Sequence, residues 1–258
     1  MRVYFITRFS IYDPNFGGFR ITRDNTPVEY EKRLFNKVRL DFKFETFQKI
    51  TFPSIVNQTA SNWSWMIYTS DLLPSEYMEK LHTMIKGYNN IKVITVKNFK
   101  EFFEKTSSFN YEKPFATVRI DDDDALNRYF VEKLQKYSDK VGSIVSFPQG
   151  RLAKYVHGSL VLGKRISEGN NAQGLSGIGM NIYNCGRHSD INERYNVIYD
   201  NSPDMFILLC SPFTDTKRGF SILERNIGRI NQLIKLMLYH PNEIPKAIAA
   251  FIKKRMKP

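Results

Sequence analysis

The stretch ATVRIDDDDAL, residues 116–126, places four consecutive aspartates directly after an apolar, β-branched run. The first half of the stretch is typical of a buried strand. Adjacent carboxylates repel one another and ionise at a cost, so another group must offset the charge of the run. We therefore expect an acidic site at the end of a buried strand.

Strands alternate with helical patterns through the first 140 residues. This alternation predicts an α/β fold with a mainly parallel sheet and helices on both faces. In such sheets ligands bind at the carboxyl ends of the strands, which is where the aspartates lie. The strand-like ranges are 2–11, 63–70, 90–97, 115–120, 142–147 and 158–163. The helical ranges are 74–88, 98–106, 125–138 and parts of 29–55, with a break at Pro53.

Two explanations of the aspartate run stay open from the residues alone. In extended geometry Asp121 and Asp123 point to one side, and Asp122 and Asp124 point to the other. A divalent cation bound by one or two of these carboxylates, together with substrate phosphates, would offset the charge, and Arg119 would add countercharge. Alternatively, Asp124 caps the helix that we expect to begin at residue 125.

Positive charge is concentrated at the C-terminus. Residues 217–258 hold ten Lys and Arg against two Glu, which gives +8 of the net charge of +12. Apolar spacing predicts an amphipathic helix over 219–240, followed by an apolar-then-basic segment over 244–258. Such a tail suits an anionic membrane surface, or else packs its apolar face on the rest of the protein.

The chain has no run of eighteen apolar residues, no pattern of a signal peptide and only two cysteines. We therefore expect a cytoplasmic protein with reduced thiols. The basic tail would place it peripherally at the inner face of the membrane.

The aspartate motif and its surroundings resemble a known family. A strand, Asp-x-Asp-Asp and a helix within an α/β pattern are similar to the metal-binding motif of nucleotide-sugar glycosyltransferases with the A-type fold. Over residues 2–220 the sequence closely resembles the putative rhamnosyltransferase family. The segments that carry this resemblance are TRFS (7–10), FPSIVNQTASNWSWMIYTSD (52–71), TVRIDDDDAL (117–126), VSFPQG (145–150) and SPDMFILL (202–209).

The resemblance implies a single A-type, Rossmann-like catalytic domain over residues 1–218 and a helical tail over 219–258. It implies that Asp123 and Asp121 bind Mn²⁺ or Mg²⁺. The residues it places at the nucleoside-diphosphate sugar donor are Thr7, Arg8, Asp71, Arg119, Asp121 and Asp122. TSDLLP (69–74) departs from the family's Asp-Asp-Gly pattern at Asp71, and CSP (210–212) stands where a His-Gly pair is expected.

The resemblance also implies an inverting reaction, which needs a general base for the acceptor hydroxyl. Asp190 and His188 fall where the superfamily places its base or a further metal ligand, in GRHSDINE (186–193). A surface loop without a catalytic role explains these residues equally well. The glycine-rich segment 150–179, with Asn170 and Asn171, predicts a mobile loop on the acceptor side.

We expect a metal-dependent glycosyltransferase of the hexosyltransferase class. The resemblance points to transfer of a sugar, rhamnose by the family's name, to a glycan or lipid-linked glycan acceptor of a surface polysaccharide. The alternative is a metal-dependent nuclease or nucleic-acid-binding protein. The positive charge avoids the half of the chain that holds the aspartates, so nucleic acid is not expected as a partner. A P-loop is excluded because GxxxxGK[ST] is absent.

Overall fold

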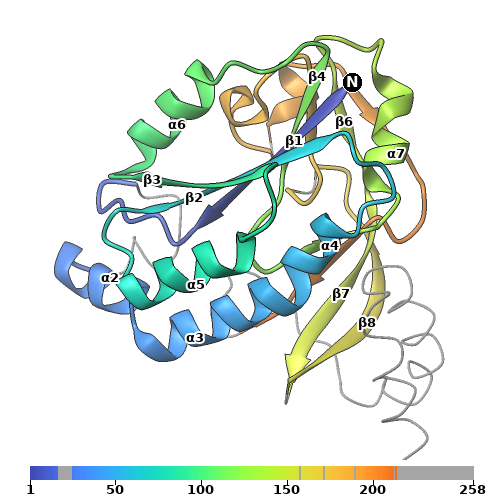
Figure 1. Ribbon diagram of the computed structural model, residues 1–258. Helices are drawn as coiled ribbons and strands as arrows, with labels where there is room; N and C mark the ends of the chain where they lie inside the picture. The colour runs from blue at the N-terminus through green and yellow to red at the C-terminus, as the bar shows by residue number, and fades with distance from the viewer. Residues whose placement is uncertain (17–24, 157, 171, 189, 212, 214–258) are drawn as a thin grey trace, which may run out of the picture.

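A seven-stranded sheet forms the centre of the protein (Figure 1). The computed structural model describes residues 1–16, 25–156, 158–170, 172–188, 190–211 and 213, and within them the strand order is β10-β6-β9-β4-β1-β2-β3. Neighbouring strands are parallel except for β9, which is antiparallel to both β4 and β6. The predicted mainly parallel α/β sheet is confirmed. The strands are β1 (Arg2–Phe9), β2 (Trp63–Ser70), β3 (Ile91–Val96), β4 (Phe115–Arg119), β6 (Ile144–Ser146), β9 (Ser176–Ile178) and β10 (Val197–Tyr199).

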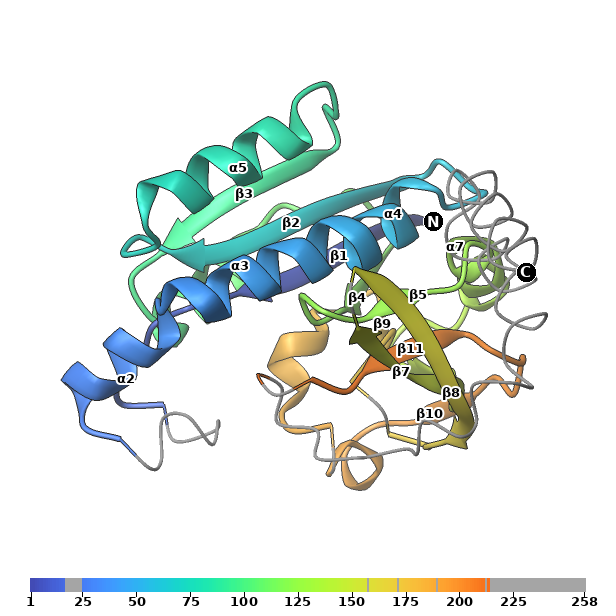
Figure 2. The same ribbon diagram turned by 90° about the horizontal axis from the view of Figure 1, so that it is seen from below.

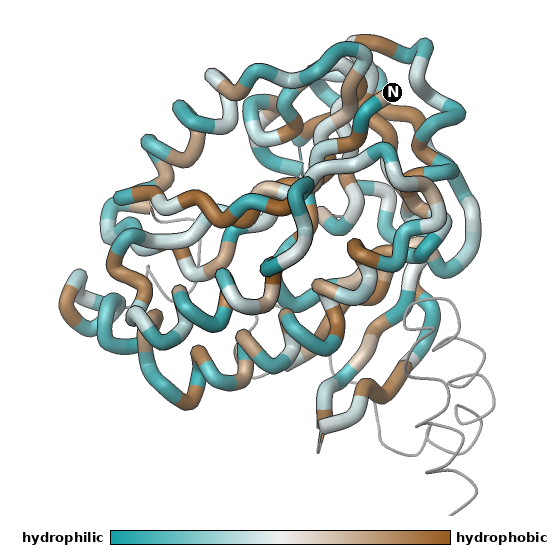
Figure 3. The backbone as a smooth tube through the Cα atoms, viewed as in Figure 1, coloured by the Kyte–Doolittle hydropathy of each residue, from teal (hydrophilic) through white to brown (hydrophobic). Residues whose placement is uncertain are grey.

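The central strands are buried on both faces. β1 and β2 alternate their side chains between two cores, with Phe5 and Trp65 in one and Tyr4 and Met66 in the other. Near-continuous apolar runs of this kind are typical of parallel strands covered on both sides. In Figure 3 apolar colouring accordingly recurs along the central strands, while the helices alternate between the two extremes.

Helices cover the two faces unequally. α3 (Lys37–Thr46), α4 (Phe52–Val56) and α5 (Ser75–Ile85) lie on one side of the sheet, and α6 (Phe99–Ser108) lies on the opposite side (Figure 1). The short α2 (Pro27–Leu34) precedes α3. α5 and α6 confirm the helices expected over 74–88 and 98–106. Two 3₁₀ turns, η3 (Ile182–Cys185) and η4 (Ile191–Glu193), follow β9.

The expected break at Pro53 is wrong. α3 continues through a π-helical turn, η1 (Phe47–Thr51), into α4, and the Phe52 N–H donates to the Phe47 carbonyl. Pro53 lies in the first turn of α4. Proline is tolerated there because its missing N–H removes few helical hydrogen bonds. The helical run therefore ends at Val56.

A second sheet has the order β5-β11-β7-β8 and lies beside the central one (Figure 2). Its strands are β5 (Ala125–Leu126), β7 (Gln149–Val156), β8 (Ser159–Ser167) and β11 (Phe206–Leu209). β7 and β8 form an antiparallel hairpin, and β11 joins β7 in parallel. The glycine-rich segment 150–179 is therefore largely strand, and the expectation of a loop is wrong for β7, β8 and β9, whereas the described residues between β8 and β9, Asn170 among them, form a connection without strand.

The helix expected over 125–138 is also wrong in its first half. Residues 125 and 126 pair with Ile207 and Phe206 of β11, and the helix α7 begins only at Phe130. α7 (Phe130–Leu134) passes into the 3₁₀ turn η2 (Gln135–Tyr137). Pairing with a strand distant in sequence has overridden the local helical pattern.

The predicted amphipathic helix over 219–240 and the apolar-then-basic segment over 244–258 lie outside the described residues, as does the domain boundary at 218. Among the described residues, no helix has the length and apolar character needed to cross a membrane. Cys185 and Cys210 are both buried and both free.

The contact between β7 and β11 yields a test of the second sheet. Gly150 lies opposite the fully buried Phe206, and a Cβ on Gly150 would come within 2.4 Å of its ring. We expect Gly150→Ala to lower the free energy of unfolding by about 1–3 kcal/mol, because the ring cannot move without strain. Urea denaturation measures the change. In the Gly150→Ala, Phe206→Leu double variant the loss should be smaller than the sum of the two single losses; full additivity would contradict this packing.

Candidate functional site

The four aspartates occupy a turn that follows β4 at the carboxyl edge of the central sheet. The Asp124 N–H lies 3.5 Å from the Asp121 carbonyl, so the run is folded back and not extended. The predicted alternation of the four side chains between two sides is therefore wrong. Asp122, Asp123 and Asp124 are buried, and Asp121 is half-buried. Each carboxylate has a different environment.

Asp121 lies between two arginines. Arg8 Nη2 is 3.3 Å from Asp121 Oδ1, and Arg119 Nη2 is 3.4 Å from both carboxylate oxygens. Burial alone would raise the pKa of Asp121, but Arg119 and Arg8 hold it well below its usual range. Both guanidinium groups also lie over the ring of Tyr183, at 5.2 Å for Arg8 and 5.8 Å for Arg119. Two cations facing one carboxylate leave a surplus of positive charge, which suits an anionic ligand.

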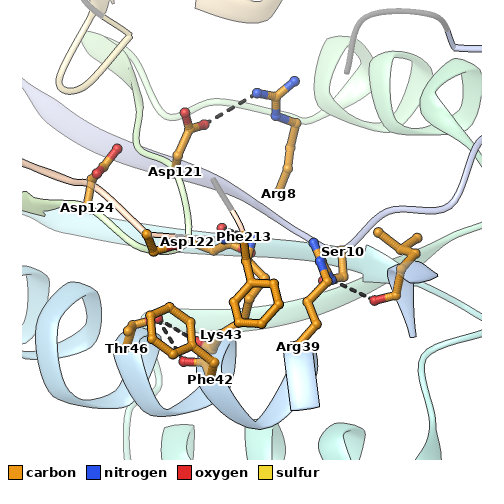
Figure 4. A network of polar contacts seen from close by, with 12 residues as sticks. Arg8, Ser10, Arg39, Phe42, Lys43, Thr46, Asp121, Asp122, Asp124 and Phe213 are labelled. Carbon is orange, nitrogen blue, oxygen red and sulfur yellow. Dashed lines mark hydrogen bonds and ion pairs between the residues drawn. The ribbon is translucent and has the colours of Figure 1, made fainter. Parts of the chain in front are cut away.

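Asp122 faces the opposite way, toward α3. Its Oδ1 accepts a hydrogen bond of 2.6 Å from Lys43 Nζ, and the side chains of Lys43 and Asp122 are only 12% and 5% exposed. Figure 4 shows Asp121 directed toward Arg8, and Asp122 beside Lys43. The second oxygen, Oδ2, is buried and accepts no hydrogen bond from any described residue.

Asp123 is 8% exposed, and no hydrogen bond or ion pair joins its side chain to another described residue. Burial raises its pKa to about 7; nearby Lys43 opposes this shift, and Asp122 and Asp121 add to it. A buried carboxylate without a donor is costly, and such oxygens are the ligands that Mg²⁺ and Mn²⁺ prefer.

Within the described part of the chain, no three or more His, Cys, Asp or Glu side chains are grouped as a metal site. A cation at this turn would therefore be held by one or two carboxylates, with its other ligands from phosphates and water. Asp123 fits that arrangement. Asp121 is already engaged by Arg8 and Arg119, so its predicted role as a metal ligand stays a prediction.

Asp124 does not cap a helix, contrary to the second explanation of the run. It accepts hydrogen bonds from the side-chain amide of Gln173 and, at 2.8 Å, from the backbone N–H of Leu209 in β11. Burial and then the neighbouring charges of Asp123 and Asp121 raise its pKa well above its usual value. Asp124 ties the turn to the second sheet.

His188 lies near this cluster. Its Nδ1 is 2.8 Å from the Asn170 carbonyl oxygen, which can only accept, so Nδ1 carries the proton and Nε2 of the neutral ring keeps a lone pair. His188 is exposed at the surface, but desolvation by its surroundings and then the charge of Arg119 lower its pKa; Arg8 also lowers this pKa, and Asp121 raises it. In this tautomer Nε2 is the ring atom that can accept a proton.

The remaining predicted residues are placed as follows. Thr7 is fully buried, and its Oγ1 accepts a hydrogen bond of 3.0 Å from Trp65 Nε1. The main chain of Thr7 is buried as well, within β1, so the predicted contact of Thr7 with the sugar donor stays a prediction. Asp71 is exposed just after β2, and half-buried Asp190 precedes η4. The structure thus brings Arg8, Arg119 and Asp121 together, with Asp122 and Asp123 on the adjoining side of the turn, and His188 lies close enough for the charges of the first three to act on it.

Sequence reasoning missed Lys43, Gln173 and Tyr183. Lys43 is 79 residues from Asp122 in the chain, and the helical pattern marks it only as one polar position among several. Gln173 lies in a segment expected to be a loop. Nothing in their sequence surroundings distinguishes these residues from solvated or core positions.

Comparisons with known proteins agree with this architecture. The family model described as Putative rhamnosyl transferase matches residues 2–221. S. aureus TarS (residues 1–349) has a similar structure, with a TM-score of 0.50 and 9% identity over 81% of this chain and 60% of that one. The same TarS fragment in complex with UDP-GlcNAc gives 0.49 and 9% identity over 92% and 67%. The chain thus spans about 60% of the first TarS structure, and at this identity the likeness shows the fold alone. A search of curated proteins found no match.

The raised pKa of Asp123 predicts a pH dependence of stability in metal-free protein. The folded protein holds this proton more tightly than the unfolded chain does, so the wild-type free energy of unfolding should fall as pH rises from about 4 to about 7. Asp123→Asn should remove the part of that fall that comes from Asp123, while the part that comes from the raised pKa of Asp124 remains. One pKa unit corresponds to about 1.4 kcal/mol. At pH 8 the free energy of unfolding of the variant should therefore exceed that of wild type by at least about 1 kcal/mol.

Urea denaturation in the presence of a chelator, at pH 4 to 8, measures this difference. Asp139→Asn is the matched control, because Asp139 is exposed and far from the turn in sequence. Parallel curves for wild type and Asp123→Asn would show that Asp123 is ionised throughout this range.

Proposed function

Because the chain belongs to the putative rhamnosyl transferase family, whose model matches residues 2–221, we propose that it is a metal-dependent, inverting glycosyltransferase. Its donor is a nucleoside-diphosphate sugar, and its acceptor is a glycan or lipid-linked glycan. The observation that carries this proposal is the pair Arg8 and Arg119 on Asp121, directly beside the buried carboxylate of Asp123. An anion-binding group and a cation-binding group at one strand edge suit a diphosphate.

The charge changes of glycosyl transfer explain these side chains. As the bond from the anomeric carbon to the donor oxygen breaks, positive charge builds on the sugar and negative charge on the leaving diphosphate. Arg8 and Arg119 are fixed over Tyr183 and stabilise that diphosphate without reorganising. A Mn²⁺ or Mg²⁺ ion at Asp123 supplies further positive charge when bound. Asp122 borders the same diphosphate site.

His188 is the proposed general base. Its Nε2 takes the proton of the acceptor hydroxyl as that oxygen bonds to the anomeric carbon, while the electron pair of the broken bond stays on the diphosphate. The hydrogen bond from Nδ1–H to the Asn170 carbonyl holds the ring in the required tautomer. Asp190, two residues on, is the alternative base.

The donor's nucleoside is proposed to lie at the ends of β1 and β2, near Thr7 and the carboxylate of Asp71. Rhamnose is the proposed sugar because of the family's name. The acceptor is proposed to belong to a surface polysaccharide made at the inner face of the cytoplasmic membrane, which suits the basic tail.

Donor binding is tested by thermal unfolding with UDP, dTDP, GDP and CDP, each with and without Mn²⁺. We expect one nucleotide to raise the wild-type unfolding temperature by several degrees, and most of the rise to need Mn²⁺. Asp123→Asn should lose the Mn²⁺-dependent part, whereas Asp139→Asn should keep it. No Mn²⁺-dependent shift with any of the four would refute the donor site.

The role of His188 is tested by replacing it. We expect His188→Gln to slow release of nucleoside diphosphate from the matching nucleotide sugar by about 10²–10⁴-fold, because the proton of the attacking hydroxyl loses its acceptor. Nucleotide binding should stay within a factor of two of wild type. His82→Gln is the control, since His82 is exposed on α5. An unchanged rate in His188→Gln would transfer the role to Asp190.

A further inference from the structure

Lys43 forms a buried ion pair that stability alone does not explain. It reaches Asp122 from the interior of α3, with both side chains almost fully removed from solvent. Replacing a buried ion pair by well-packed apolar residues is often neutral or stabilising, because burying two charges is costly. The pair is therefore better explained by a function than by its contribution to stability.

The pair leaves Asp122 half satisfied. Oδ1 accepts from Lys43, but the buried Oδ2 accepts from no described residue. Asp123 is the next residue, and its side chain makes no hydrogen bond or ion pair with any described residue. The positive charge of Lys43 acts on both carboxylates, since it also lowers the pKa of Asp123. A buried oxygen of Asp122 without a donor, next to the carboxylate of Asp123 that makes no hydrogen bond with a described residue, points to a cation.

Positive side chains balance the acids around the turn. Arg8 and Arg119 face Asp121, Lys43 is paired with Asp122, and Lys43 and Arg39 both act on Asp123, so four cations lie near the four carboxylates of the turn. A free divalent cation would enter a site with little net negative charge. A nucleoside diphosphate brings the missing negative charge, together with phosphate oxygens as ligands.

We propose that Lys43 is a positioning residue that occupies Asp122, so that a divalent cation binds weakly by itself and tightly only together with the donor's diphosphate. This inference rests on the proposed function. With Asp122 occupied by Lys43, Asp123 is the carboxylate that the protein offers to the cation. The remaining ligands come from the donor, which couples cation binding to donor binding.

Binding of Mn²⁺ without nucleotide tests the inference, with free Mn²⁺ followed by its electron paramagnetic resonance signal. Lys43→Gln removes the charge but keeps a hydrogen-bond donor for Asp122. It should bind Mn²⁺ at least tenfold more tightly than wild type, because a second carboxylate becomes available. Lys43→Arg keeps the charge and should match wild type.

The double variant Lys43→Gln, Asp122→Asn is the matched control. It removes the lysine charge and the carboxylate together, so its Mn²⁺ affinity should return to within about threefold of wild type. Equal or weaker Mn²⁺ binding by Lys43→Gln than by wild type would overturn the inference.

Wild type provides a second measurement that needs no variant to fold. Addition of the nucleoside diphosphate selected by thermal unfolding should tighten Mn²⁺ binding at least tenfold, and binding that ignores the nucleotide would overturn the inference. If nucleotide-dependent Mn²⁺ binding is lost in Asp123→Asn but Lys43→Gln matches wild type, only the role of Lys43 fails. If neither wild type nor any of these variants binds Mn²⁺, with or without the nucleotide, the metal-dependent part of the proposed function fails as well.

Discussion

Four carboxylates within one turn repel one another, and burial strengthens this repulsion because the dielectric around them is low. The fold accommodates the turn by giving each carboxylate a different environment. Asp121 faces two arginines, Asp122 faces Lys43, and Asp124 accepts hydrogen bonds from Gln173 and the Leu209 N–H. Asp123 is left with a raised pKa and no hydrogen bond from a described residue. The charges that a diphosphate and a cation would meet follow from this division.

The partners of these carboxylates come from distant parts of the chain. β1 supplies Arg8, α3 supplies Lys43, and the segment before β9 supplies Gln173. The site is therefore a property of the assembled sheet. Replacing one of these partners should change the pKa values of the neighbouring carboxylates, since charges this close do not act independently.

Much of the fold could be predicted because its signals are local. The apolar runs of β1 and β2 and the helical spacing of α5 show their periods within one element, and the aspartates mark a strand end. The helix predicted from residue 125 failed because Ala125 and Leu126 pair with β11, about 80 residues later. The role of Lys43 could not be predicted either, because only the packing of α3 against the sheet brings it to Asp122.

Among the described strands of the central sheet, the antiparallel β9 has a wider effect than its three residues suggest. Because β9 runs against its neighbours, its first residue, Ser176, lies beside Val118, close to the edge where parallel strands end. The chain must cross that edge to enter β9, and the crossing segment carries both the Asn170 carbonyl and the Gln173 amide. An insertion or deletion between β8 and β9 would therefore change the orientation of His188 and the anchoring of Asp124 in one evolutionary step. Related chains that differ in this segment's length should differ in both features together.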